Sequence, residues 1–255
     1  MRQTDDVERF ASFDGVQIAY TVVGGGPDVL LIHGFASDHH GNWVAPGVRD
    51  AIAATGRRVI AYDARGHGQS DKPHDVGAYE NNAMVRDAQA LLDLLDVTAV
   101  DVVGYSMGSI VSTRLVPIEA RTRSLVLGGV GARRPRSREA RDRIAAALES
   151  PGGAVPGEGP AERAFRQFAA RGGNDLAALA AVQRATNPRG DLRAIHVPTL
   201  VVAGEEDNLA GSPGELAEMI PGATAQVVPG NHLSAVGRPE FTSAITGFLG
   251  RVSPV

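Results

Sequence analysis

The feature that most constrains the fold is a series of short apolar runs, built from β-branched and aliphatic residues with few polar interruptions. The runs are Asp28–Ile32, Arg58–Tyr62, Val100–Val103, Ser124–Leu127, Thr199–Val202 and Ala225–Val228. Strands without polar alternation are typical of a parallel sheet that is buried on both faces. Helix-forming stretches separate several of the runs, the clearest being Ala83–Leu95, a helix that begins at Ser212-Pro213, and Pro239–Leu249. This alternation predicts an α/β fold with a mostly parallel sheet, covered by helices on both faces.

Two segments depart from the alternation. Near the start, Val7–Phe13 and Val16–Val23 are β-rich runs joined at Asp14-Gly15, a dipeptide typical of a two-residue hairpin turn. Between Ala132 and His196 there is no strand-like run. Three helices are predicted there, at Arg138–Leu148, Ala161–Ala170 and Asp175–Ala185. We interpret this interval as a helical cap over the carboxyl edge of the sheet, which gives a core at 1–131 and 197–255 and a cap at 132–196.

The composition excludes several kinds of partner and chemistry. A chain of 255 residues that is 43% apolar can bury one sizeable core, and a formal net charge of −4 offers no basic field for nucleic acid. The absence of cysteine removes disulfides, thiolate metal sites and a cysteine nucleophile. The charged residues 1–9 lack the apolar core of a signal peptide, and no apolar run is long enough to span a membrane. We therefore expect a soluble cytoplasmic protein, and no pattern specifies its oligomeric state.

One turn carries the strongest indication of chemistry. Gly104-Tyr105-Ser106-Met107-Gly108 follows the run Val100–Val103 and precedes Ser109–Val116, which is compatible with a helix. In a G-x-S-x-G turn between strand and helix, the backbone reverses sharply and holds the serine hydroxyl at the tip, where flanking side chains would clash. Ser106 would then face the crevice outside the carboxyl end of the sheet. The alternative is a glycine-rich connection that contains a serine by chance.

A serine nucleophile needs a general base, and that base needs an orienting group. His232 follows the last predicted strand, on a loop at the same edge of the sheet as Ser106. The acid is expected between these two residues in sequence. Glu205-Glu206-Asp207 follows the run Thr199–Val202; we favour Asp207 and keep Glu206 as the alternative. The equivalent position after the preceding strand reads Gly128-Gly129-Val130 and has no carboxylate.

Two backbone amides are candidates to stabilise an oxyanion. One belongs to Met107, directly after the serine, and the other to Phe35, in the His33-Gly34-Phe35 turn that ends the first apolar run. We expect the His33 side chain itself to be structural.

With these motifs in place, the chain resembles an α/β-hydrolase-fold serine hydrolase along essentially its whole length. The motifs, in the family's order, are His33-Gly34-Phe35, Asp63-Ala64-Arg65-Gly66-His67-Gly68-Gln69-Ser70, Gly104–Gly108, Gly204–Asp207 and Gly230-Asn231-His232. The resemblance implies Ser106 as nucleophile, Asp207 as acid and His232 as base. We expect no metal or other cofactor. The resemblance also implies that the Asp63–Ser70 loop is structural, which leaves His67 outside the site. Ser109 is a departure, because many relatives carry a second glycine there.

Some branches of the family are disfavoured. Epoxide hydrolases and haloalkane dehalogenases of this fold use an aspartate nucleophile, and the former also need cap tyrosines; this chain has Ser106, and 132–196 contains no tyrosine. Hydroxynitrile lyases of this fold use a cap lysine, but Lys72 lies outside the cap. The chain is most similar to bacterial esterases, enol-lactone hydrolases and haloperoxidase-like, perhydrolytic esterases.

Fewer residues give information about the substrate. Six arginines at the start of the cap could attract a carboxylate, although a solvated helix face is the better interpretation: Arg133, Arg134, Arg136, Arg138, Arg141 and Arg143. His39 and His40, beside Trp43, could line the entrance, but their spacing is not that of a metal site. The candidates for substrate contact are Phe35, Trp43, Tyr105 and Met107.

The sequence thus predicts a cofactor-independent hydrolase, of the carboxylic ester hydrolase class, that acts on a small-molecule ester, lactone or similar acyl compound. Hydrolysis of a C–C bond, perhydrolysis and acyl transfer are alternatives on the same residues. A non-catalytic ligand-binding protein of this fold is the alternative from another class.

Overall fold

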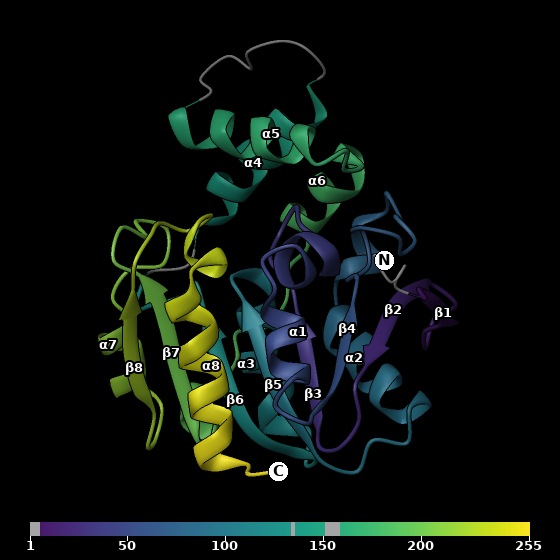
Figure 1. Cartoon of the computed structure of the whole chain (residues 1–255). Coiled ribbons are helices and arrows are strands. Elements are labelled where there is room, and N and C mark those ends of the chain that lie inside the picture. Colours follow the sequence, from purple (N-terminus) through teal and green to yellow (C-terminus); the bar gives the residue numbers. More distant parts are fainter. Residues whose placement is uncertain (1–5, 134–135, 151–158) are drawn as a thin grey trace.

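The computed structural model describes residues 6–133, 136–150 and 159–255, and its centre is one eight-stranded sheet (Figure 1). The strand order is β1-β2-β4-β3-β5-β6-β7-β8. Strands β3 to β8 are parallel, whereas β2 is antiparallel to both β1 and β4. The strands are β1 (Glu8–Ala11), β2 (Gln17–Val23), β3 (Asp28–Ile32), β4 (Arg58–Tyr62), β5 (Val100–Tyr105), β6 (Thr122–Gly128), β7 (Thr199–Gly204) and β8 (Thr224–Val228). The predicted fold class is confirmed.

Helices cover both faces of the sheet. On one face, α2 (Ala83–Leu94), α3 (Met107–Leu115) and α7 (Pro213–Glu218) pack on alternate strand residues such as Leu30 and Val102. On the other face, α1 (Val48–Ala53) and α8 (Pro239–Val252) pack on the residues between them, such as Leu31 and Val103. Because successive side chains of a strand point to opposite faces, a strand buried on both must be apolar throughout. This explains the continuous runs of the sequence.

The sequence analysis missed the helical segment between β3 and β4. A π-helical turn, η1 (His40–Val44), leads into α1, which begins after Gly47 at a φ of 81°. The spacing of Val48 and Ile52, both fully buried, was the available signal. Such a short helix gives only one apolar repeat, so its pattern is weak.

The N-terminal hairpin is present, but the prediction of a two-residue turn is wrong. The connection runs from Ser12 to Val16, with a hydrogen bond from the Ser12 amide to the Val16 carbonyl, and only Gly15 has a positive φ. Ser12 Oγ donates to Asp87 Oδ1 at 2.6 Å, and Asp14 accepts from Arg65 at 2.8 Å. These side-chain contacts draw the loop towards a buried arginine.

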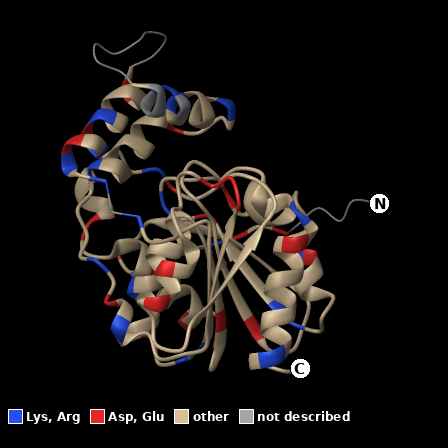
Figure 2. Ribbon diagram, turned by 90° about the vertical axis from the view of Figure 1, so that its left-hand side faces the viewer, with Lys and Arg blue, Asp and Glu red and all other residues tan. Residues whose placement is uncertain are grey.

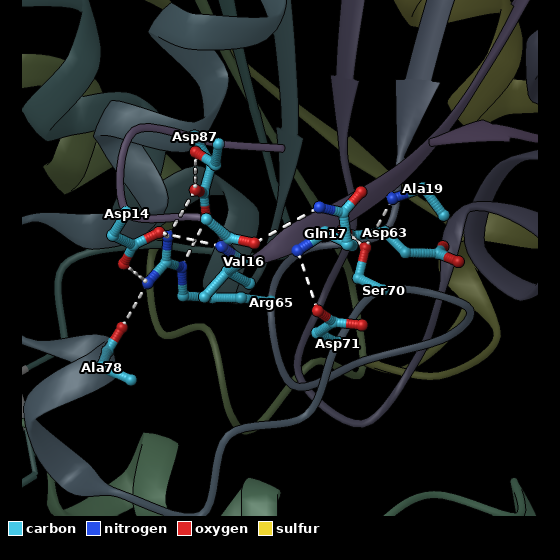
Figure 3. A network of polar contacts seen from close by, with 12 residues as sticks. Asp14, Val16, Gln17, Ala19, Asp63, Arg65, Ser70, Asp71, Ala78 and Asp87 are labelled. Atoms are coloured by element: carbon cyan, nitrogen blue, oxygen red, sulfur yellow. Dashed lines mark hydrogen bonds and ion pairs between the residues drawn. The ribbon is translucent and has the colours of Figure 1, made fainter. Parts of the chain in front are cut away.

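That arginine, Arg65, is the centre of a polar network in the loop after β4 (Figure 3). Its guanidinium is fully buried and donates to Asp14, to Asp87 and to the Ala78 carbonyl. Further along the loop, Ser70 Oγ accepts from the Ala19 amide at 2.8 Å, which ties the loop to β2. The contacts are those of a structural element, as the resemblance implied for Asp63–Ser70.

Three helices lie above the carboxyl edge of the parallel strands (Figure 1): α4 (Arg138–Glu149), α5 (Pro160–Arg171) and α6 (Leu176–Arg184). Each end of these helices lies within one residue of the predicted bound. They share an apolar cluster that includes Ile144, Leu148 and Leu179, and Phe35 and Ala36 of the core contribute to it. Residues 1–5, 134–135 and 151–158 lie outside the described residues, and so do Arg134 and most of the predicted break between the first two cap helices.

Hydrogen bonds from two asparagine side chains help to fasten this layer to the core. Asn187 Nδ2 donates to the Tyr79 carbonyl at 2.8 Å, and Asn174 Nδ2 donates to the Ala36 carbonyl at 3.1 Å. Four short 3₁₀ turns complete the described elements: η2 (Val76–Tyr79), η3 (Val116–Ile118), η4 (Leu192–Ala194) and η5 (Ala235–Gly237). None of the helices in the described ranges combines the length and the apolar character needed to cross a membrane.

Candidate active site

Ser106 lies at the tip of a strained turn between β5 and α3. Its φ of 52° and ψ of −107° are outside the regions that a residue with a side chain usually adopts. A Cβ on Gly104 would lie 2.6 Å from the backbone of Gly108, and a Cβ on Gly108 would collide with the Ile32 carbonyl at the end of β3. The two glycines are therefore required by the close packing of strand and helix around the serine.

Ser109, where many relatives have glycine, fits this turn with a contact of its own. Its side chain is fully buried, and Oγ donates to the Gly128 carbonyl at 2.8 Å. The Ser106 amide donates to the same carbonyl, also at 2.8 Å. The departure thus adds a second donor to the carbonyl at the end of β6 and leaves the turn intact.

The structure brings Ser106, His232 and Asp207 together. Ser106 Oγ is 3.0 Å from His232 Nε2, and His232 Nδ1 is 2.8 Å from Asp207 Oδ2. Because a carboxylate only accepts hydrogen bonds, the Nδ1 proton is donated to Asp207, and Nε2 is left to accept the serine proton. The three side chains come from loops at the ends of β5, β7 and β8, so the sheet sets their spacing.

Backbone contacts hold the acid and the histidine loop side by side. The second oxygen of Asp207 accepts from the amides of Leu209 at 3.0 Å and Ala210 at 2.9 Å. A Cβ on Gly204 would collide with the Gly230 carbonyl, so a glycine at this position lets the two loops approach. Asp207 is 6% exposed and contacts His232, whereas Glu206 is exposed. Of the two acids kept open by the sequence, the geometry selects Asp207.

The loop after β3 lies against the serine turn. The Gly34 amide donates to Asn42 Oδ1 at 2.9 Å, and an added Gly34 Cβ would lie 3.5 Å from the Cβ of Ser106. Within the described residues, neither the Phe35 amide nor the Met107 amide donates a hydrogen bond to another part of the chain. Asn42, which lies in η1 and is 4% exposed, is a contact that no sequence signal indicated.

Two buried histidines adjoin this loop. His33 Nε2 accepts from the Ala64 amide at 2.9 Å, so its Nδ1 is protonated and donates to the Gly34 carbonyl at 2.7 Å. Burial lowers the pKa of His33, and it lowers the pKa of His67 to about 3. Both rings are therefore neutral near pH 7, and His67 packs against Phe35 with the ring centroids 5.8 Å apart. Their contacts position the loop, in agreement with the structural role expected for His33.

The four candidates for substrate contact differ in exposure. Trp43 is 0% exposed and Tyr105 is 4% exposed; the two rings pack edge to face at 6.4 Å beneath the site. A side chain enclosed in this way offers no surface to a ligand. Phe35 and Met107 are partly exposed, and Phe35 also faces Phe165 of the cap at a centroid distance of 6.1 Å. These two remain the candidates for substrate contact.

The other polar groups of the entrance are mostly occupied. His39 is buried, with Nδ1 2.7 Å from Asp63 Oδ1, while the exposed His40 borders a cavity of about 190 Å³ between the core loops and the cap turn at Gly172.

Acidic and basic residues are interspersed over the cap (Figure 2). Four of the arginines at the start of the cap have partners. Arg141 donates to the Ala185 carbonyl, and Arg133 donates to the Asn208 carbonyl. The Arg136 guanidinium lies 4.8 Å from the centroid of the Phe165 ring, and Arg138 lies 3.8 Å from Asp142. No group of three potential metal ligands occurs in the described part of the chain.

Comparison with known proteins identifies the class to which this architecture belongs. The family model described as the alpha/beta hydrolase fold matches residues 27–135. A hydrolase from Pseudomonas aeruginosa PA01 is 30% identical, and the alignment covers 97% of this chain and 100% of that one with a TM-score of 0.75. The chain therefore belongs to the α/β-hydrolase fold family, which confirms the resemblance found in the sequence.

Two further relatives carry more particular names. A thermophilic esterase from Thermogutta terrifontis is 28% identical over 97% of this chain and 99% of its own, with a TM-score of 0.79. An epoxide hydrolase from Caballeronia sordidicola is 35% identical over 96 residues, which are 38% of this chain and 28% of that protein. The first curated relatives are likewise matched over little more than a quarter of their length, 28% in each case. The chain thus has the α/β-hydrolase fold, and its relatives include proteins named as an esterase and as an epoxide hydrolase.

Proposed function

We propose that this protein is a cofactor-independent serine hydrolase that cleaves a carboxylic ester, a lactone or a similar activated acyl compound. The observation that carries the proposal is the bridging position of His232, with one ring nitrogen at Ser106 and the other at Asp207. A serine that is hydrogen-bonded to an oriented histidine is the arrangement that activates a hydroxyl for nucleophilic attack. A ligand-binding protein of this fold would have no use for all three groups.

In the proposed reaction, Ser106 Oγ attacks the carbonyl carbon while its proton passes to His232 Nε2. The oxygen that becomes negative accepts hydrogen bonds from the Phe35 and Met107 amides. The C–O bond to the leaving group then breaks, and the alkoxide takes the proton from His232. Water attacks the resulting acyl-enzyme and gives a proton to His232, which returns it to Ser106 as the acid product leaves. Asp207 stabilises the His232 imidazolium both when the acyl-enzyme forms and when water cleaves it.

An epoxide hydrolase reaction is less compatible with the turn Gly104–Gly108 that carries Ser106. Epoxide hydrolases of this fold use a carboxylate nucleophile and cap tyrosines, whereas this turn presents a serine and 132–196 contains no tyrosine. We also propose that 132–196 is a cap domain inserted into the core. Phe35 follows Gly34, which lies against the Ser106 turn, and it packs on the cap's apolar cluster, so the cap is placed to determine which acyl groups enter.

Replacement of Ser106 tests the function directly. We expect Ser106→Ala to lower the turnover of p-nitrophenyl acetate at least about 10⁴-fold, because the nucleophile is lost while binding is retained. The matched control is Ser243→Ala, which removes a hydroxyl from α8, away from the site. Wild-type protein, but not Ser106→Ala, should also form a stable adduct with a fluorophosphonate. Undiminished hydrolysis by Ser106→Ala would refute the assignment, and failure of the wild type to react would favour a binding protein.

A further inference from the structure

The residue that precedes the serine joins the serine turn to the histidine loop. Tyr105 is the last residue of β5, and its hydroxyl donates to the backbone carbonyl of His232 at 2.6 Å. The bond spans 127 residues of sequence and is part-buried. It therefore fixes the distance between the strand that carries Ser106 and the backbone that carries the His232 imidazole.

The Tyr105 ring cannot move to follow the loop, because it is enclosed on several sides. Trp43 and Phe241 meet it edge to face, with centroids at 6.4 Å and 5.6 Å. A Cβ on Gly129 would lie 2.8 Å from the ring, and one on Gly128 would lie 2.9 Å from it. The hydroxyl is thus held at one point, and the His232 carbonyl is fixed to that point.

The histidine loop is also tied to the acid loop, where the Glu206 amide donates to the Gly230 carbonyl at 3.0 Å, but that bond lies two residues before His232. The side-chain oxygen of Asn231 accepts hydrogen bonds from the amides of Leu233 and Ser234 in the same loop, and Leu233 is 60% exposed. Burial raises the pKa of the Tyr105 hydroxyl, with the Asp207 charge acting in the same direction, so the group stays a donor across the working range of a histidine base.

We propose that Tyr105 is a positioning residue of the active site, which holds the His232 backbone so that the imidazole reaches Ser106 and Asp207 together. The inference rests on the proposed function, because it assigns Tyr105 a role in that same site. It gives the buried tyrosine a task other than substrate contact. Its consequence is a loss of turnover without a loss of substrate binding when the hydroxyl is removed.

The test compares Tyr105→Phe with Tyr79→Phe. Tyr79 is also buried, and its hydroxyl also donates to a backbone carbonyl at 2.6 Å, that of Pro73, in a loop apart from the three site residues. We expect Tyr105→Phe to lower kcat for p-nitrophenyl acetate about tenfold and to change KM less than about twofold, since small misplacements of a catalytic group reduce turnover steeply. Tyr79→Phe should leave both constants within about twofold of the wild type.

Two further measurements keep the inference open to refutation. Proton NMR should detect the His232 Nδ1 proton as a downfield resonance in the wild type and in Tyr79→Phe, and the resonance should broaden in Tyr105→Phe. Incorporation of 4-aminophenylalanine at position 105 restores a donor at the same place, and it should recover most of the lost kcat even if Tyr105→Phe folds poorly.

The outcomes separate this inference from the proposed function. If wild-type protein shows no turnover that depends on Ser106, the proposed function fails, and the NMR comparison alone still decides the role of Tyr105. If the wild type is active, an unchanged kcat in folded Tyr105→Phe overturns the positioning role. An unchanged downfield resonance in that variant overturns it as well.

Discussion

Ser106 and its neighbours illustrate how strongly single residues are constrained at this site. The serine keeps a positive φ because Gly104 and Gly108 remove the side chains that would oppose it, and because its amide is bonded to the Gly128 carbonyl. The strain is thus maintained by three separate segments of the core. A change to any of them is expected to affect the reactivity of Ser106 before it affects the fold.

At the residue scale, the adjacent acids Glu206 and Asp207 provide a matched pair. We expect Asp207→Asn to lower kcat about 10⁴-fold, because an amide at this position favours the wrong tautomer of His232. Glu206→Gln removes the same charge one residue away from an exposed side chain and should leave kcat within about twofold. Steady-state kinetics on p-nitrophenyl acetate measure both. Equal losses in the two variants would contradict the selection of Asp207.

The meeting of the three residues of the proposed triad could be predicted from the sequence because each follows a recognisable strand. Parallel strands bring their carboxyl ends to one edge, so Ser106, Asp207 and His232 were expected to meet there. Asn42 and the role of Tyr105 could not be predicted in this way. Asn42 lies in a five-residue π-helical turn without a periodic pattern, and the bond of Tyr105 to His232 depends on the three-dimensional path of a loop.

Among the elements, the loop after β4 is the one most dependent on buried charge. Arg65 and Asp87 are both fully enclosed, and the loop, the connection between β1 and β2, and α2 meet through them (Figure 3). A buried charge that loses its partner is costly, whereas an exposed pair contributes little. The conformation of the loop that carries His67 therefore depends on residues that never reach the site.

We expect Asp87→Asn to lower the free energy of unfolding by about 3–5 kcal/mol, because it removes the fully buried one of the two carboxylates that pair with the Arg65 guanidinium. The matched control is Asp142→Asn in α4, which weakens an exposed pair with Arg138 and should cost less than about 0.5 kcal/mol. Urea unfolding measures both values. A similar small loss in the two variants would show that the network is not a source of stability.

On the scale of the whole molecule, buried neutral histidines make the protein sensitive to acid. His67 has a pKa of about 3 in the folded chain, against an ordinary value of 6.5. Below pH 6.5 the unfolded chain therefore binds a proton that the folded chain does not, so stability falls as the pH is lowered. The lowered pKa of His33 acts in the same direction. Asp63, with a pKa of about 2, adds to the loss only below its ordinary value of 3.8.

The contribution of His67 is expected to be about 1.4 kcal/mol per pH unit between pH 6.5 and pH 3, or about 2 kcal/mol at pH 5. In His67→Phe, the free energy of unfolding should depend less steeply on pH by that amount, whatever the absolute stability of the variant. The exposed His196→Gln should keep the wild-type dependence. Urea titrations from pH 7.5 to pH 4.5 provide the measurement, and an unchanged slope in His67→Phe would exclude the effect.

At the same scale, the architecture was easier to predict than its connections. Strands such as Asp28–Ile32 and Arg58–Tyr62 were located to the residue, because burial on both faces leaves an unmistakable apolar run. The conformation of the hairpin turn at Asp14 and the presence of helix α1 were not predicted correctly. Asp14 is drawn towards Arg65, 51 residues away, and α1 is stabilised by packing against α8 near the end of the chain. Local patterns do not contain such distant partners.

The glycine pair at the end of β6 has a consequence for how this site can change. Gly128 and Gly129 leave the space that the Tyr105 ring fills. A carboxylate introduced at position 129, the other location for an acid, would be accommodated only after residue 105 had become small. That first step would also release the His232 loop. We therefore expect substitutions at positions 105 and 129 to be coupled, because a side chain at position 129 and the Tyr105 ring compete for the same space.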